Sequence, residues 1–129
     1  MKTNPSISPT VSAPATTLTE ARDIALRARS LLIDKKGRNV IVFDARGASP
    51  ITDYVVIASG ATAPQIKAMT NELKRGLKEK GVPLYRQSGQ SDDGWVVMDY
   101  VDVVVHMFLD EARTYYAIED LWSALPRVE

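Results

Sequence analysis

The 129-residue chain contains no cysteine, a single histidine and no net charge, and each of these shortages excludes a class of protein. Without cysteine there can be no disulfide, thiolate metal site or cysteine nucleophile, which is compatible with a reducing cytosol and a cytoplasmic protein. A metal site would have to combine His106 with carboxylates, a poor ligand set for zinc, so we expect neither metal nor cofactor. No apolar stretch approaches the roughly 20 residues that cross a bilayer, so we expect no membrane-spanning role.

The zero net charge conceals two halves of opposite sign. Residues 1–91 contain fourteen Lys and Arg against seven Asp and Glu. Between Asp92 and Asp120 the balance reverses, since Arg113 is the only base among eight acids: Asp92, Asp93, Asp99, Asp102, Asp110, Glu111, Glu119 and Asp120. Most of the aromatic residues fall in the same segment. Acids around aromatic rings are typical of a docking patch for a basic partner, although ordinary solvated turns would also account for the acids.

The composition changes near residue 17, which sets the domain boundaries. The opening letters, MKTNPSISPTVSAPATT, are rich in proline and hydroxyl residues and show no apolar periodicity, so we predict a disordered tail over residues 1–17. Residues 18–126 are long enough for one domain with a single core. Residues 127–129 remain as a C-terminal tail.

Periodicity predicts helices around the first two strands. Thr17 and Glu20 have capping-box spacing before an amphipathic helix that ends near Gly37, and Thr62 with Gln65 repeats this spacing before a second helix that ends near Gly81. Between them, NVIVFDA and DYVVIASG are apolar runs typical of buried strands. The connection RGASPIT is too short to hold a helix, so these two strands should be antiparallel neighbours.

The last third predicts a short strand at PLYRQ, a hairpin and a final helix. Residues 95–99 and 103–108 form the hairpin, with its turn near Tyr100 to Asp102. Both faces of the returning strand are apolar, as expected for a central strand. Asp110 can cap a last helix with Tyr115, Ile118 and Trp122 on one side. The fold class is therefore α/β, a single mixed β-sheet with helices packed on it.

Three patterns point towards enzymatic or nucleic-acid chemistry, and each has a simpler structural explanation. The letters ASGATAPQ could bind phosphate at a helix start, but they lack the second glycine and the lysine of known phosphate loops. Asp99 and Asp102 are three residues apart across a turn, which argues against a two-metal site. The lysines between Lys67 and Lys80 are interrupted by acids and lack interleaved aromatics, so a solvated helix face is favoured over an RNA-binding stripe.

Two stretches, SPITDYVVIASGATAPQIKAM and GWVVMDYVDVVVHMFLDEARTYYAIEDLW, closely resemble the Iojap family of ribosomal silencing factors. The resemblance covers roughly Leu18 to Pro126 and includes Asp53–Tyr54, Ala58–Ser59–Gly60 and Leu121–Trp122 in family order and spacing. Two positions depart from it: Val101 stands where glycine is common, and SALP replaces a GDAP-like ending. Since valine disfavours positive φ, we expect the hairpin tip to differ from that of the family.

The resemblance implies a nucleotidyltransferase-like fold without that superfamily's catalytic residues, and no enzymatic activity. It implies binding to the large ribosomal subunit through its ribosomal protein numbered fourteen, which blocks joining of the small subunit and represses translation when nutrients are short. It further implies a homodimer and no sequence-specific contact with nucleic acid. The partner-binding residues it predicts are Trp95, Met98, Asp99, Tyr100, Asp102 and His106. The alternative that stays open is a metal-dependent nucleotidyltransferase or phosphate-binding enzyme on the same fold.

Overall fold

The backbone forms one mixed sheet with the strand order β1-β2-β5-β4-β3, seen in a computed structural model that describes residues 17–117 and 119–128. The strands are β1 (Arg38–Asp44), β2 (Tyr54–Gly60), β3 (Arg86–Ser88), β4 (Trp95–Asp99) and β5 (Val103–Leu109). The helices are α1 (Ala21–Asp34), α2 (Ala63–Lys78), the short 3-10 helix η1 (Ser91–Asp93), α3 (Asp110–Tyr115) and α4 (Glu119–Trp122). Of the predicted tail over residues 1–17, residues 1–16 lie outside the described residues.

The pairing of the strands confirms the two predicted neighbour relations. β1 and β2 are antiparallel, and β4 and β5 form an antiparallel hairpin whose turn spans residues 100–102. The sequence did not predict the antiparallel pairing of β3 with β4 or the parallel pairing of β2 with β5, which sets Tyr54 beside Val103. This pairing makes β5 a central strand, as its two apolar faces indicated.

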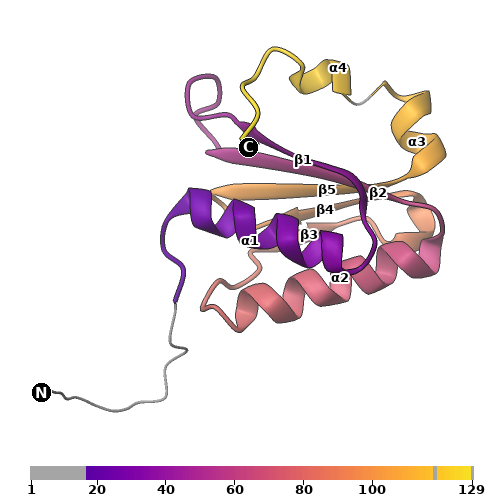
Figure 1. Cartoon of the computed structure of the whole chain (residues 1–129), viewed down its shortest axis with the longest axis horizontal. Coiled ribbons are helices and arrows are strands. Elements are labelled where there is room, and N and C mark those ends of the chain that lie inside the picture. Colours follow the sequence, from indigo (N-terminus) through magenta and orange to yellow (C-terminus); the bar gives the residue numbers. More distant parts are fainter. Residues whose placement is uncertain (1–16, 118, 129) are drawn as a thin grey trace, which may run out of the picture.

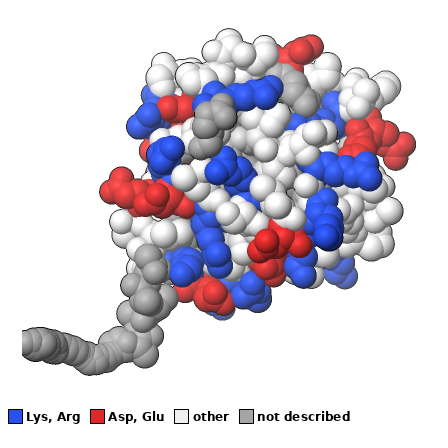
Figure 2. Space-filling view, viewed as in Figure 1, with Lys and Arg blue, Asp and Glu red and all other residues white. Residues whose placement is uncertain are grey.

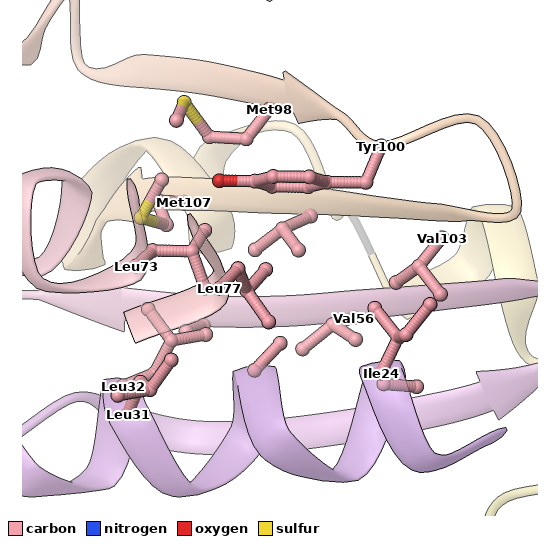
Figure 3. Close-up of a cluster of buried hydrophobic side chains, with 14 of the residues drawn as sticks. Ile24, Leu31, Leu32, Val56, Leu73, Leu77, Met98, Tyr100, Val103 and Met107 are labelled. Carbon is pink, nitrogen blue, oxygen red and sulfur yellow. The ribbon is translucent and has the colours of Figure 1, made fainter. Parts of the chain in front are cut away.

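Helices α1 and α2 lie together on one face of the sheet, whereas α3 and α4 lie on the opposite side (Figure 1). We call the side covered by α1 and α2 the helix face. Its core holds apolar side chains from both helices and from the strands, among them Leu31, Leu73, Val56 and Met107 (Figure 3). Gly76 lets the helices approach closely, because a Cβ at that position would collide with the Leu31 side chain. No helix among the described residues is long and apolar enough to cross a membrane.

The predicted helix starts are right for α2 and wrong for α1. Thr62 caps α2 by accepting a hydrogen bond from the Gln65 N–H at 3.2 Å, and the Gln65 side chain accepts one from the Ala61 N–H at 2.7 Å. Glu20 stands at the cap position of α1, where no side chain caps the helix. The entry to α1 is instead fixed from a distance, because the Leu18 N–H donates to the Lys80 carbonyl at 3.0 Å.

The single C-terminal helix that the sequence predicted is wrong, because the chain breaks it into α3 and α4. Ala117 adopts a φ of +49°, which no right-handed helix can contain. Asp110 begins α3 as its first residue and pairs with Arg38 at 2.6 Å instead of capping the helix. The third residue of the predicted apolar side, Ile118, lies outside the described residues.

The chain after α4 returns along the edge of β1, and the domain therefore extends beyond the predicted boundary at residue 126. The Asp44 N–H donates to the Pro126 carbonyl, and the Val128 N–H donates to the Val42 carbonyl, both at 2.8 Å. Arg127 forms a bridge with Phe43 and places its guanidinium 5.8 Å from the Phe43 ring centre. These bonds cover part of an edge strand that would otherwise offer free backbone groups.

Candidate partner-binding surface

Strands β4 and β5 present different side chains to the two faces of the sheet, because successive residues of a strand point in opposite directions. Towards α1 and α2 they bury Val96, Met98, Val103, Val105 and Met107 completely. The opposite side of the sheet, which we call the aromatic face, carries Trp95, Val97, Asp99, Val104, His106 and Phe108. Phe108 is buried, and the other five are only partly buried.

Rings from β4, from β5, from the end of α3 and from α4 gather on this side. They form what we call the aromatic cluster, namely Trp95, His106, Phe108, Tyr116 and Trp122. The Trp95 ring centre lies 4.8 Å from that of Phe108 and 6.2 Å from that of Tyr116. The His106 ring centre lies 5.0 Å from that of Trp122. These separations are within the range of favourable aromatic contacts. Since most of the rings remain partly exposed, the cluster can take up further apolar contacts from a partner.

His106 is held by a hydrogen bond within the aromatic cluster. The Trp95 indole Nε1–H donates to His106 Nδ1 at 3.1 Å, so that nitrogen carries no proton and the neutral ring is protonated at Nε2. Burial lowers the pKa of His106 from 6.5 to about 4, because the imidazolium would lose its hydration. Near neutral pH the aromatic cluster is therefore uncharged, and the carboxylates around it supply the charge of this surface.

The hairpin tip beside the cluster has a strained backbone. Val101 adopts a φ of +75°, a region that β-branched residues rarely occupy. The turn therefore has the positive φ that a valine was expected to disfavour. The Asp99 carboxylate holds the turn by accepting a hydrogen bond from the Val101 N–H at 2.8 Å, and it also lies 3.6 Å from Arg86. Asp102 is exposed, while its backbone carbonyl accepts bonds from the N–H groups that begin β2.

Two of the six predicted partner-binding residues are core residues, which corrects the sequence prediction. Met98 is fully buried and Tyr100 is 5% exposed. Figure 3 shows the Tyr100 ring reaching into the helix-face core towards Met98 and Met107. Burial raises the pKa of Tyr100 to about 12, and its hydroxyl finds no hydrogen-bond partner among the described residues. Trp95, Asp99, Asp102 and His106 remain as candidates for direct contact.

The structure adds residues to this surface that the predicted set omitted. Tyr115 and Tyr116 are exposed at the end of α3, and Trp122 of α4 lies in the aromatic cluster beside His106. Their aromatic character was visible in the sequence. Their position over the sheet was not, because it depends on the break at Ala117 and on the return of the chain to β1.

Side chains already engage two backbone N–H groups around the start of α2. The Gln65 N–H donates to the Thr62 hydroxyl, and the Ala61 N–H, just before the helix, donates to the Gln65 side chain. The Gln65 amide donates in turn to the Lys36 carbonyl at 2.9 Å. Across residues 17–117 and 119–128, no three histidine or carboxylate side chains gather as ligands for a metal ion. Asp99 and Asp102 therefore belong to no such group of ligands within the described chain.

The charged side chains of α2 form a mixed surface. Arg75 pairs with Glu72 at 3.0 Å and with Glu79 at 2.8 Å. The Arg75 guanidinium lowers the pKa of Glu72, as expected for a hydrogen-bonded carboxylate. Figure 2 shows basic and acidic side chains interspersed over the part of the molecule where α1 and α2 lie. This pattern is that of a solvated helix face.

Comparison with known proteins gives concordant matches. Residues 18–129 match the sequence model of a family described as ribosomal silencing factor during starvation. The ribosomal silencing factor RsfS of Halalkalibacterium halodurans is 38% identical over 96 residues, which cover 74% of this chain and 82% of that protein. A mouse protein named mitochondrial assembly of ribosomal large subunit protein 1 is 31% identical over 97 residues, covering 73% of this chain and 42% of that protein. A crystal structure of a Chromobacterium violaceum protein superimposes with a TM-score of 0.77 at 35% identity, covering 81% of this chain and 88% of that one.

Proposed function

The chain belongs to the ribosomal silencing factor family, and we propose that it binds the large ribosomal subunit through its aromatic face and thereby blocks joining of the small subunit. The proposed contact on the ribosome is the large-subunit ribosomal protein numbered fourteen. A protein bound at the inter-subunit surface excludes the small subunit sterically, which represses translation when nutrients are limiting. The proposed site of action is the cytoplasm, and the proposed role is not catalytic.

The observation that carries this proposal is the partly exposed aromatic cluster with carboxylates at its margins. Trp95 and His106 offer apolar contact area, and Asp99 and Asp102 lie at the hairpin tip of the same sheet. Ribosomal proteins are typically basic. A surface of aromatic rings and carboxylates can therefore offer such a protein both apolar contact and charges of opposite sign. The name of the mouse relative, which refers to assembly of the large subunit, supports an association with that subunit.

Met98 and Tyr100 have a supporting role in this proposal. They fill the core directly beneath the hairpin and fix the path of β4, so that Trp95 and Asp99 project from the opposite side. A homodimer is part of the proposal as well, because a partly exposed aromatic surface could be covered by a second copy when no ribosome is bound.

The test is sedimentation of purified large and small ribosomal subunits, with and without a molar excess of this chain, under conditions in which the subunits join. We expect the chain to travel with the large subunit and the joined particle to disappear. Chain that stays at the top of the gradient while the subunits join normally would refute the proposal.

The site assignment has its own test in paired variants. Charge reversal at Asp99 together with Asp102 should abolish co-sedimentation, because it replaces attraction to a basic partner by repulsion. Reversal of Asp23 together with Asp34, two exposed acids of α1, is the matched control and should leave binding intact. Circular dichroism of both proteins must first show an unchanged fold.

A further inference from the structure

A groove of about 400 Å³ opens beside the aromatic cluster, between η1 and α3. Its walls are Asp92, Asp93, Gly94, Leu109, Glu111, Ala112, Tyr115 and Tyr116. The groove adjoins the cluster directly, since the Tyr116 ring lies 6.2 Å from that of Trp95.

The backbone around Gly94 builds one wall of this groove. Gly94 has a φ of +80°, a left-handed conformation that ends η1 and turns the chain into β4. Its carbonyl accepts a hydrogen bond from the Leu109 N–H at 3.0 Å, which ties the beginning of the hairpin to its end. This bond brings the two acids of η1 across from α3, although they are some 20 residues away along the chain.

The charge of the groove has one sign. Three carboxylates line it and none of its lining residues is basic. Asp93 is engaged locally, because its carboxylate accepts a hydrogen bond from the Gln90 N–H at 2.9 Å. Asp92 and Glu111 form no ion pair with any described residue. Their charges therefore remain available to a cation from outside.

The tyrosines add a second feature that favours a cation. Tyr115 is 81% exposed and Tyr116 is 57% exposed, which is unusual for rings of this size. Their ring centres lie 5.0 Å apart at an angle of 84°, so the two π faces point in different directions. An aromatic face attracts a cation through its quadrupole, and arginine does this more often than lysine.

We propose that this groove receives an arginine side chain of the protein partner, with the guanidinium held between Asp92 and Glu111 and against the Tyr115 ring. A guanidinium fits better than an ammonium because it is planar, stacks on aromatic rings and meets carboxylates through a fork of donors. The inference rests on the proposed function, since the partner is the basic ribosomal protein that covers the aromatic cluster next to the groove. It adds to that function the side chain that is recognised and the pocket that recognises it.

The first test compares two charge reversals in the full-length chain. Asp92→Lys with Glu111→Lys should weaken binding to purified large subunits more than about tenfold in sedimentation titrations, because a favourable charge pair becomes repulsive. The control Asp23→Lys with Asp34→Lys makes the same change of charge, and Asp23, like Glu111, lies in the first turn of its helix. Equal affinity of the two variants would overturn the arginine pocket. A loss of thermal stability without a loss of affinity would overturn it too, since the acids would then only stabilise the helix starts.

The ring is tested separately. Tyr115→Ala should weaken binding several-fold, whereas Tyr115→Phe keeps the π face and should bind nearly as the original chain does. Tyr85→Ala is the matched control, because Tyr85 is also a largely exposed tyrosine, 69% by area, and contributes nothing to the groove. If Tyr115→Phe binds as weakly as Tyr115→Ala, the ring face is not the contact.

A ribosome-free experiment separates failure of the groove from failure of the proposed function. The peptide Gly-Gly-Arg-Gly-Gly, titrated into the labelled chain, should shift backbone amide resonances of residues 92–94 and 109–116, and the lysine peptide should shift them less. These shifts without any binding to large subunits would refute the proposed function and keep the groove. Ribosome binding that survives the charge reversal, with no peptide-induced shifts, would refute the groove and keep the function.

Discussion

The helix face and the aromatic face of the sheet differ in how completely their apolar side chains are covered. On the helix face, Leu73, Leu77 and Met107 are fully buried between the sheet and the two long helices. On the aromatic face, Phe108 is fully buried, while Trp95 and His106 keep part of their surface in water. The cover on that side consists of two short helices and an extended segment instead of two long helices.

This difference separates stability from binding. Burial of apolar area stabilises the fold in proportion to the area removed from water, so the helix face contributes most of that stabilisation. The aromatic face leaves part of its apolar area exposed, and that area is available to a partner. Substitutions on the helix face should therefore lower the free energy of unfolding, and substitutions on the aromatic face should lower affinity.

The largest expected effect is on the helix face. Leu73→Ala should lower the free energy of unfolding by about 2–5 kcal/mol, through lost transfer energy and the cavity left behind. Leu121→Ala, at a leucine that is 64% exposed, should change it by less than about 0.5 kcal/mol. Urea denaturation of both variants measures the contrast, and similar losses would mean that the two faces are equally important for stability.

The next largest effect is expected on the aromatic face, where a substitution should lower affinity more than it lowers the free energy of unfolding. Trp95→Ala should reduce affinity for the large subunit about 30-fold or more, as expected for a central aromatic contact residue. Trp95→Phe keeps a ring in the aromatic cluster and should lose less, which separates the ring from the indole N–H. Titration with large subunits measures the affinity of each variant, and urea denaturation measures its free energy of unfolding. A loss of stability without a loss of affinity would mean that Trp95 is a core residue and not a contact residue.

Between pH 6.5 and 5 the stability of the fold should depend on pH through His106 on the aromatic face. The pKa of His106 is about 4 in the fold against 6.5 ordinarily, so the unfolded chain takes up the proton first as the pH falls. The contribution of His106 to the free energy of unfolding is therefore fully present above pH 6.5 and is lost as the pH falls towards 4. The free energy of unfolding changes by at most ~1.4 kcal/mol per pH unit in that range.

The readout is the free energy of unfolding between pH 6.5 and 5, above the range in which most carboxylates titrate. His106→Gln should flatten this slope while keeping an acceptor for the Trp95 indole. An unchanged slope in the variant would show that His106 is not the group responsible.

The smallest effect is expected at the hairpin tip. Val101→Gly should raise the free energy of unfolding by about 0.5–1 kcal/mol, because glycine removes the steric cost of a φ of +75° but adds entropy to the unfolded chain. Val101→Ala is the control and should stabilise less, since alanine keeps a Cβ. Thermal denaturation of the three proteins tests this, and a destabilised Val101→Gly variant would mean that valine makes contacts that outweigh its strain.

Much of the local structure could be predicted from residues that are close in sequence. Thr62 and Gln65 mark the start of α2 because their capping bonds join neighbours along the chain. The turn at residues 100–102 was predictable because apolar alternation stops on either side of it. Thr17 and Glu20 have the same spacing as the pair that caps α2, yet the distant Lys80 carbonyl determines how the chain enters α1.

The candidate site was predictable in composition and only partly in detail. Alternation places Trp95 and Asp99 on one face of β4 and Met98 on the other, so the period of two already divided the predicted set. It did not tell which face the long helices would cover, because both faces are rich in apolar residues. The groove between η1 and α3 was not predictable, since its two walls come from segments joined only through the hairpin.

By itself, the sequence determined the existence of the main helices and strands, the antiparallel neighbours, and the concentration of acids and rings between Asp92 and Trp122. These properties follow from local propensity, spacing and charge, which act between residues near in the chain. Only the tertiary structure decided the parallel pairing of β2 with β5, the burial of Met98 and Tyr100, and the break at Ala117. Those outcomes depend on which surfaces meet when segments distant in the sequence pack together. The free energy of that packing depends on the apolar area buried and on the geometry of the contact, which a pattern of neighbouring residues does not contain.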